Sequence, residues 1–192
     1  MSQDLISGAF ARHESVLGST RDIFPDIEKG AGLLLDIVRA NKFVFTCGNG
    51  GSAADAQHLA AEFTCRYKDD RKPLAAILLG ANFSHLTAVG NDYSFEDVFS
   101  RELETLGREG DILVAFTTSG SSKNILKAIE VARAKKMKVI MLTGQKGKSL
   151  AAKADVLIAI PSEETARIQE MHELIYHVWC EYIDANLTNS TT

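Results

Sequence analysis

Short, fully apolar runs alternate along the chain with longer segments in which apolar residues recur every three or four positions. The runs, each four to six residues long, lie at 42–47, 74–79, 112–116, 139–142 and 156–160. Uninterrupted apolar runs of this length are typical of strands buried on both faces of a sheet. The longer segments predict helices at 52–67, 82–104 in two pieces, 122–136 and 148–153. This alternation predicts an α/β protein with a parallel sheet and right-handed crossovers.

Both ends of the chain carry only the helical pattern. No strand-like run precedes residue 42, where residues 3–18 predict one helix and a second begins near Pro25. A long final helix is predicted at about 163–187, with Leu174, Ile175, Val178 and Ile183 as core residues. We therefore expect one domain over residues 1–192, with 1–40 as an N-terminal helical extension and 41–192 as the α/β core.

The composition argues against several classes of protein. The 192 residues are 45% hydrophobic and 24% charged, which is enough to bury a core. The 21 basic and 25 acidic residues give a net charge of −4, which argues against a broad nucleic-acid surface. No apolar run approaches the roughly 20 residues of a membrane span, and we expect no secretory signal. Three cysteines without a CxxC spacing predict buried thiols in a reducing cytoplasm.

A glycine-rich turn, CGNGGS at residues 47–52, follows the first predicted strand. Its glycines allow backbone conformations with positive φ and a close approach of a ligand. Ser52 and Asp55 match a capping box, which would fix the start of the next helix. The turn lacks the Lys-Ser/Thr ending of a Walker A loop and is not a full GxGxxG motif. Its exposed N–H groups would attract an anion or sugar hydroxyls rather than a dinucleotide, but many glycine-rich turns between a strand and a helix are only tight turns, and the turn alone leaves that interpretation open.

A second unusual loop, TTSGSS at 117–122, follows the third predicted strand. Hydroxyl groups and free N–H groups at a helix N-terminus suit a phosphate group. The alternative is a Ser/Thr-rich helix cap with surplus hydroxyls, and the loop alone leaves both interpretations open. Neutralisation of a phosphate would depend on the helix dipole and on Lys123, because the loop contains no arginine.

Two helices carry residues that could transfer protons or bind a metal ion. His58 and Glu62 are four residues apart, so they project from the same face of a helix. In the final helix, Gln169, Glu173 and His177 follow one line at i, i+4 and i+8. Such residues are more often structural or surface groups than ligands. We expect His172 to be a surface or interface residue, and Arg167 to be either an anion contact or a salt-bridge partner.

Five motifs occur together and in order: CGNGGS at 47–52, His58 with Glu62, Gly-Asn-Asp at 90–92, Thr-Ser-Gly at 118–120 and Arg-Ile-Gln-Glu at 167–170. In these motifs the chain resembles the sugar isomerase (SIS) family, and within it the phosphoheptose isomerases, over nearly its full length. The resemblance implies a five-stranded parallel sheet between helices, a homotetramer and a zinc ion. It also implies conversion of sedoheptulose 7-phosphate to D-glycero-D-manno-heptose 7-phosphate in the biosynthesis of activated heptose for lipopolysaccharide or other surface glycans.

The resemblance assigns roles to residues at matching positions. It implies sugar contacts from Asn49, Gly50, Gly51, Asn91 and Asp92. It implies phosphate contacts from Thr117, Thr118, Ser119 and Ser122. It implies zinc ligands at His58, Glu62, Gln169 and His177, of which Glu62 and Gln169 would also contact substrate. Glu62 and His177 would be the acid/base pair, whereas Ser121 and Ala166 depart from the family's usual Asn and Asp.

Helix geometry adds an inference about assembly. Gln169 and His177 are eight residues apart, which is roughly 12 Å along a helix at about 1.5 Å per residue. Both side chains would have to stretch far to reach one ion from the same copy of the helix. We therefore expect an active site at a subunit interface, with His177 or Gln169 donated by a neighbouring chain.

Two other functions remain open from the sequence. The chain could be a non-catalytic SIS relative that binds a replication initiator, since that group shares the glycine loop and the segment at 166–172. That group lacks equivalents of Glu62 and His177, which favours the enzyme. The chain could also be an isomerase for another sugar phosphate, because its length alone does not distinguish a six-carbon from a seven-carbon substrate.

Overall fold

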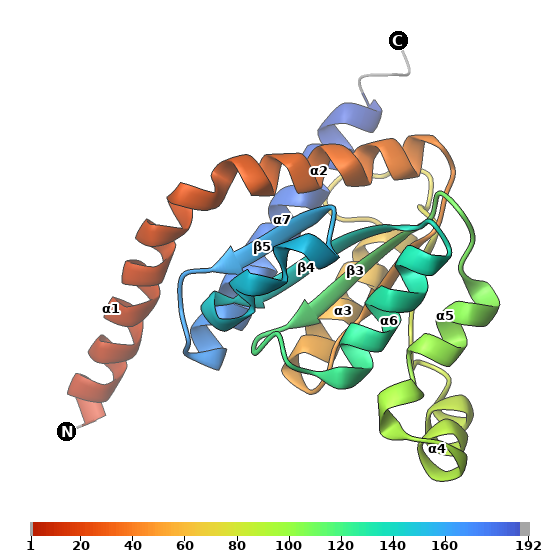
Figure 1. Cartoon of the computed structure of the whole chain (residues 1–192). Helices are drawn as coiled ribbons and strands as arrows, with labels where there is room; N and C mark the ends of the chain where they lie inside the picture. Colours follow the sequence, from red (N-terminus) through yellow and green to blue (C-terminus); the bar gives the residue numbers. More distant parts are fainter. Residues whose placement is uncertain (1, 189–192) are drawn as a thin grey trace.

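A five-stranded parallel sheet forms the centre of the computed structural model, which describes residues 2–188 (Figure 1). The strands are β1 (Val44–Cys47), β2 (Ala76–Leu78), β3 (Ile112–Thr117), β4 (Lys138–Gly144) and β5 (Val156–Ile160). Their order in the sheet is β2-β1-β3-β4-β5, and all neighbours are parallel. The predicted α/β class with a five-stranded parallel sheet is therefore confirmed.

Burial differs between the centre and the edges of the sheet. Every residue of β1 and β3 is buried, whereas β2 is half-buried throughout and β5 alternates between buried and half-buried residues. The expectation of strands buried on both faces is thus wrong for β2 and β5. These two strands lie at the edges, where less of the molecule covers them.

Seven α-helices surround the sheet in the described part of the chain. They are α1 (Ser2–Thr20), α2 (Phe24–Arg39), α3 (Gly51–Thr64), α4 (Phe83–Asp92), α5 (Ser100–Leu106), α6 (Lys123–Ala134) and α7 (Thr165–Thr188). Short 3₁₀ helices lie at Arg21–Ile23, Phe95–Asp97 and Gln145–Lys153. The helix predicted at 148–153 is therefore 3₁₀ rather than α.

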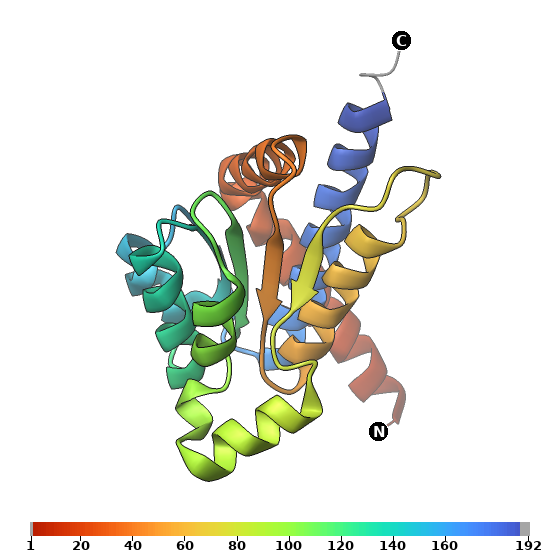
Figure 2. The ribbon, with the colours of Figure 1, turned by 90° about the vertical axis from the view of Figure 1, so that its right-hand side faces the viewer.

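The helices form layers on both faces of the sheet, as Figure 2 shows from the side. One apolar core joins α2, α3 and α7 to strand residues such as Val114 and Leu142. The other joins α5 and α6 to strand residues of the opposite face, such as Leu113 and Met141. Within residues 2–188, no helix combines the length and apolar character needed to cross a membrane.

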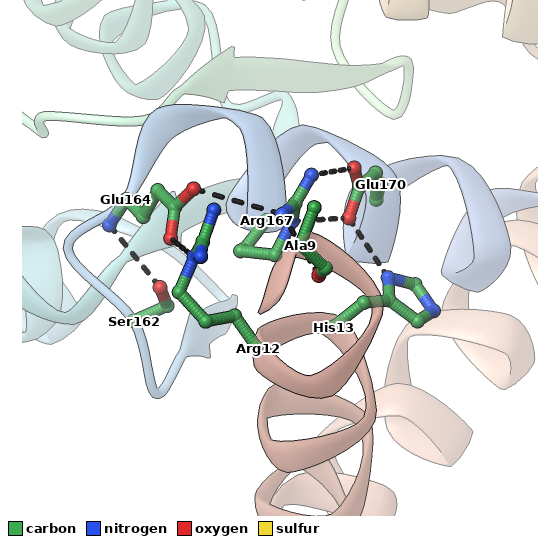
Figure 3. A network of polar contacts seen from close by, with 7 residues as sticks. All are labelled: Ala9, Arg12, His13, Ser162, Glu164, Arg167 and Glu170. Carbon is green, nitrogen blue, oxygen red and sulfur yellow. Dashed lines mark hydrogen bonds and ion pairs between the residues drawn. The ribbon is translucent and has the colours of Figure 1, made fainter. Parts of the chain in front are cut away.

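Helix α1 extends away from the sheet and meets the start of α7 through a polar network (Figures 1 and 3). Arg167 forms an ion pair with Glu170 and donates to the Ala9 carbonyl at 3.1 Å. His13 Nδ1 lies 2.8 Å from Glu170 Oε2, and Arg12 pairs with Glu164 at 3.0 Å. Of the two interpretations of Arg167, the structure supports the salt bridge.

Two expectations about exposure are wrong. Cys47 and Cys180 are buried thiols, but Cys65 is exposed because it lies at the C-cap of α3, where the helix meets a surface loop. Leu174 and Val178, expected in the core, are each 43% exposed. They lie on the side of α7 that faces neither the sheet nor α3.

Candidate active site

The strand order reverses between β1 and β3, since the chain passes from β1 outward to β2 and then returns to β3 on the other side. Ligands of such sheets bind at this point, beyond the carboxyl ends of the strands. Here Asn49 and Asn124 exchange two side-chain hydrogen bonds of 2.9 and 2.8 Å. These bonds join the loop after β1 to the start of α6. Asn124 is 4% exposed, and no local pattern in the sequence indicated its role.

A cavity of about 240 Å³ lies at this point of the sheet. Its lining residues are Asn49, Gly51, Ser52, Phe116, Thr117, Thr118, Ser122, Thr165 and Gln169. Six of the nine were predicted to bind substrate, and the other three were missed. A larger cavity of about 530 Å³ near the amino ends of β1 and β2 contains none of the predicted residues. We therefore take the smaller cavity as the candidate site.

Five predicted substrate contacts lie outside the lining of this cavity, and one of them, Glu62, belongs to a second group of residues described below. Gly50 and Ser119 are exposed next to it, and Ser119 Oγ accepts hydrogen bonds from Ser121 N and Oγ at 3.2 and 2.9 Å. Asn91 and Asp92 are exposed at the end of α4, where Asn91 Nδ2 donates to Asp92 Oδ1 at 2.8 Å. Their predicted contacts with the sugar stay predictions.

The start of α3 differs from the predicted capping box. The N-cap is Gly50, with a φ of 56°, and no side chain caps the helix. Ser52 N donates to the Asn49 carbonyl at 3.0 Å, so backbone groups make the turn and Ser52 already lies within the helix. Asp55 is buried with Oδ2 unpaired, and burial together with Glu173 raises its pKa to about 6.

The TTSGSS loop places hydroxyl groups along the cavity. Thr117 Oγ1 lies 3.2 Å from Ser122 Oγ and accepts a hydrogen bond from Gly120 N at 3.2 Å. Ser122 is the N-cap of α6 but makes no side-chain capping bond. Lys123 forms an ion pair with Glu96 at 2.9 Å, so its charge is already partly neutralised by a carboxylate. The helix dipole and the hydroxyl groups are therefore the features that suit an anion here.

A second group of predicted residues lies where α3 packs against α7. One ligand atom each of His58, Glu62 and His177 lies within 4.8 Å of the others. We call these three residues the acid–base cluster. His58 Nε2 and Glu62 Oε1 are 3.0 Å apart, and the side chain of Glu62 is 19% exposed. The structure thus brings three of the four predicted metal ligands together within one chain.

The acid–base cluster fits a zinc ion by its chemistry and its spacing. Imidazole nitrogens and a carboxylate are common zinc ligands at about 2.0–2.1 Å. Two such ligands of a tetrahedral ion lie about 3.3 Å apart, whereas here His58 Nε2 and Glu62 Oε1 share a hydrogen bond of 3.0 Å and the three ligand atoms lie within 4.8 Å of one another, so small side-chain shifts would suffice to surround an ion.

Two tyrosines that the sequence did not single out support the acid–base cluster. The Tyr176 hydroxyl lies 2.8 Å from His58 Nδ1, and burial raises the pKa of Tyr176, which keeps the hydroxyl protonated. The Tyr67 ring stacks on His177 with 5.4 Å between ring centroids. Aromatic residues at helical spacing usually indicate a core, so the sequence gave no signal for these contacts.

Gln169 belongs to the cavity rather than to the acid–base cluster. Its side chain lies against Gly51, where a Cβ atom would meet Gln169 Nε2 at 2.5 Å. His177 reaches His58 and Glu62 within its own chain, so a neighbour need not donate it to them. Whether a neighbour brings Gln169 and the acid–base cluster together stays a prediction.

His172 is fully buried, which corrects the expectation of a surface or interface histidine. Its ring packs against Phe116 and its Nε2 lies 3.4 Å from the Thr143 carbonyl. Burial lowers its pKa to about 4. The line through Gln169, Glu173 and His177 suggested a polar face, but His172 lies off that line and points at the sheet.

The class of the protein follows from its similarity to known proteins. A family model described as "SIS domain" matches residues 14–144. The phosphoheptose isomerase of Helicobacter hepaticus is 47% identical over 186 residues, which are 95% of this chain and 93% of that protein.

Solved structures give the same result. A phosphoheptose isomerase from Neisseria gonorrhoeae has a TM-score of 0.90 and 41% identity, over 96% of this chain and 100% of its own. One from Francisella tularensis has a TM-score of 0.92 and 38% identity, over 96% of this chain and 99% of its own. The chain belongs to the SIS domain family, and within it to the phosphoheptose isomerases.

Proposed function

We propose that this protein is an aldose–ketose isomerase that converts sedoheptulose 7-phosphate to D-glycero-D-manno-heptose 7-phosphate. This reaction would begin the biosynthesis of activated heptose for lipopolysaccharide or other surface glycans. The observation that carries the proposal is the acid–base cluster, which combines a carboxylate and two imidazoles in a phosphoheptose isomerase fold. Isomerisation through an enediol needs one base at carbon and one group that moves protons between oxygens.

The residues of this chain supply both groups. Glu62 would take a proton from C1 of the ketose and return it to C2 of the enediol. His177 would move a proton from O1 to O2, since an imidazole can donate and accept near neutral pH. The net reaction transfers hydrogen between adjacent carbons and oxygens and requires no external oxidant or reductant.

The cavity would bind the remainder of the substrate. Thr117, Thr118, Ser119 and Ser122 would hold the phosphate at the N-terminus of α6. The sugar hydroxyls would contact the glycine turn and the end of α4 through Asn49, Gly50, Gly51, Asn91 and Asp92. Asn49 is held in place by Asn124, so its amide is already oriented when substrate arrives.

We also propose one zinc ion per subunit, held by His58, Glu62 and His177 with Gln169 as a further ligand. When bound, zinc would polarise the carbonyl and hydroxyl oxygens of the substrate. A ligating Glu62 cannot act freely as a base, so its carboxylate has to exchange between the two roles. The fit of the ligand spacing supports this proposal.

The active site is proposed to be shared between subunits of a homotetramer. Within one chain, Gln169 and His177 are eight residues apart, or roughly 12 Å along α7. Gly51 and Glu62 are eleven residues apart, or roughly 16 Å along α3. Both helices therefore carry the acid–base cluster away from the cavity, and a neighbouring chain would bring a second cluster to it.

An apolar groove supports assembly with a second copy of the chain. The groove, of about 450 Å³, lies between α1, α2 and α7, and its lining residues include Leu17, Phe24, Leu174, Val178 and Tyr182. Each of these five is at least 38% exposed. The groove and the acid–base cluster lie on different sides of α7, so a neighbouring chain seated in the groove would not cover the cluster of the same helix. We further propose a cytoplasmic location, which suits three free cysteines.

Co-assembly of two inactive variants tests the shared site. Tetramers that mix Gln169→Ala and Glu62→Gln chains contain some sites with an intact cavity from one chain and an intact acid–base cluster from another. We expect activity well above either variant alone. A mixture of Glu62→Gln and His177→Ala is the control, since both changes damage the same cluster and no intact one remains. Equal behaviour of the two mixtures would contradict a shared site.

Single variants test the acid/base roles. General acid–base catalysis contributes about 10²–10⁴-fold, so Glu62→Gln should lower kcat by about that factor with little change in KM. Glu173→Gln is the matched control, because Glu173 lies 3.7 Å from His58 Nδ1 but is exposed on α7. We expect its kcat within about threefold of the wild type. A Glu62→Gln enzyme of normal kcat would remove Glu62 from the mechanism.

A further inference from the structure

The loop between α3 and β2 contains a buried arginine beside the acid–base cluster. The side chain of Arg71 is 5% exposed and that of Asp184, on α7, is 4% exposed. Arg71 Nε donates to Asp184 Oδ1 at 2.6 Å. A buried charge pair of this kind persists only with good geometry and further hydrogen bonds.

The same guanidinium donates to the main chain at the end of α3. One terminal nitrogen donates to the carbonyl of Glu62 at 2.9 Å, and the other to the carbonyl of Phe63 at 3.2 Å. The last four carbonyls of a helix have no partner within the helix, so side chains often satisfy them. The main-chain carbonyl of Glu62 accepts the 2.9 Å bond, and the side chain of the same residue is the proposed base.

Arg71 therefore connects the two helices that form the acid–base cluster. Asp184 is seven residues beyond His177, two turns along the same face of α7. The loop makes a second contact with the cluster through Tyr67, whose ring stacks on His177. The planar fork of an arginine can bridge a carboxylate and two carbonyls at once, which a lysine ammonium cannot.

We propose that Arg71 is a positioning residue that fixes the Glu62 carboxylate relative to His58 and His177. Its bond to the Glu62 carbonyl sets the end of α3, and its bond to Asp184 sets α7 against that end. The effect on catalysis rests on the proposed function, but the effect on the spacing of the acid–base cluster does not. Arg71 does not line the candidate cavity of about 240 Å³, and the role proposed for it is positioning rather than proton transfer.

The test uses Arg71→Lys and Asp184→Asn in the full chain. Arg71→Lys keeps a charge beside Asp184 but loses the fork, whereas Asp184→Asn keeps the bonds to the two carbonyls. Arg108→Lys is the control, because Arg108 donates to the carbonyls of Thr105 and Gly107 at the end of α5, remote from the cluster. Three measurements are made on each: a crystal structure, the affinity for Zn²⁺ against a chromophoric chelator, and kcat and KM.

We expect Arg71→Lys to fold and to displace the Glu62 carboxylate from its 3.0 Å contact with His58. Loss of an outer partner of a metal site typically weakens metal affinity or activity by about 10–100-fold. We expect this range for Zn²⁺ affinity and for kcat, with KM nearly unchanged, a smaller effect for Asp184→Asn and none for Arg108→Lys.

The outcomes separate the two proposals. A wild type inactive on sedoheptulose 7-phosphate, with a displaced Glu62 in Arg71→Lys, refutes the proposed function and leaves the positioning role standing. A crystal structure of Arg71→Lys with an unmoved acid–base cluster overturns the positioning role whatever the activity. If Arg71→Lys fails to fold, the Asp184→Asn variant provides the test. An unmoved acid–base cluster and an unchanged Zn²⁺ affinity in Asp184→Asn would then overturn the positioning role of Arg71.

Discussion

Gly51→Ala probes the cavity with the smallest possible change. The added Cβ would lie 2.5 Å from Gln169 Nε2 and 2.9 Å from Gln169 Cδ, whereas ordinary contact begins at 3.4 Å. The Gln169 amide must therefore withdraw by about 1 Å. Because this is the far end of a flexible side chain, the fold can absorb the change.

The expected loss of activity follows from that displacement. A misplacement of about 1 Å in a positioning group can reduce the rate roughly 100-fold. This corresponds to about 2.7 kcal/mol of transition-state stabilisation, at about 1.36 kcal/mol for each factor of ten. Gly51 is the first residue of α3, so alanine should leave the free energy of unfolding unchanged or raise it by up to about 1 kcal/mol.

The assay measures kcat/KM on sedoheptulose 7-phosphate and urea unfolding for the same variant. The control is Gly32→Ala in α2, where an added Cβ meets no atom within 4 Å. We expect full activity in the control and roughly 1% of it in Gly51→Ala, with both proteins folded. A folded Gly51→Ala enzyme with kcat/KM within about threefold of the wild type would show that Gln169 does not position substrate.

Two further predictions concern stability and assembly. The pKa of His172 is about 4 in the folded chain and about 6.5 when unfolded, so the unfolded state binds the proton first. The contribution of His172 to the free energy of unfolding is complete above pH 6.5 and is lost as the pH falls, by about 3 kcal/mol at pH 4. In denaturant unfolding, His172→Phe should lack this part of the pH dependence of the free energy of unfolding. An equal pH dependence in wild type and variant would show that His172 is not its source. Val178→Asp places a charge in the apolar groove, so light scattering should show a mass below four times 20.9 kDa. An unchanged mass in Val178→Asp would exclude the groove as an interface.

The centre of the fold was predictable because its signals are local. The apolar runs that became β1 and β3 and the helical repeat between them follow directly from burial. The burial of the edge strands β2 and β5 was less predictable, because an apolar run does not show how much of the molecule covers it. The Ser52–Asp55 pattern suggested a cap, but the turn needed a residue with positive φ, and Gly50 supplies it.

The residue types of the candidate site were predictable from the sequence, but the partners that hold those residues in place were not. The loops after β1 and β3 and the pair His58–Glu62 carry local patterns that indicate their chemistry. The partners that hold them come from distant parts of the chain. Asn49 and Asn124 are 75 positions apart, and Arg71 and Asp184 are 113 apart. Such contacts depend on the tertiary structure, so a single sequence gives no sign of them.

Proton transfer by the enzyme is the central claim, and NMR of the reaction in D₂O tests it most directly. Sedoheptulose 7-phosphate is incubated with the wild type and with Glu62→Gln, first with a chelator and then with added Zn²⁺. The predicted result is formation of the aldoheptose 7-phosphate by the wild type, with deuterium at C2 wherever the proton held on Glu62 exchanges with D₂O before it is returned, and a rate about 10²–10⁴-fold lower for Glu62→Gln. The absence of any aldoheptose phosphate under all conditions would contradict the account and favour a sugar-phosphate-binding protein without catalysis.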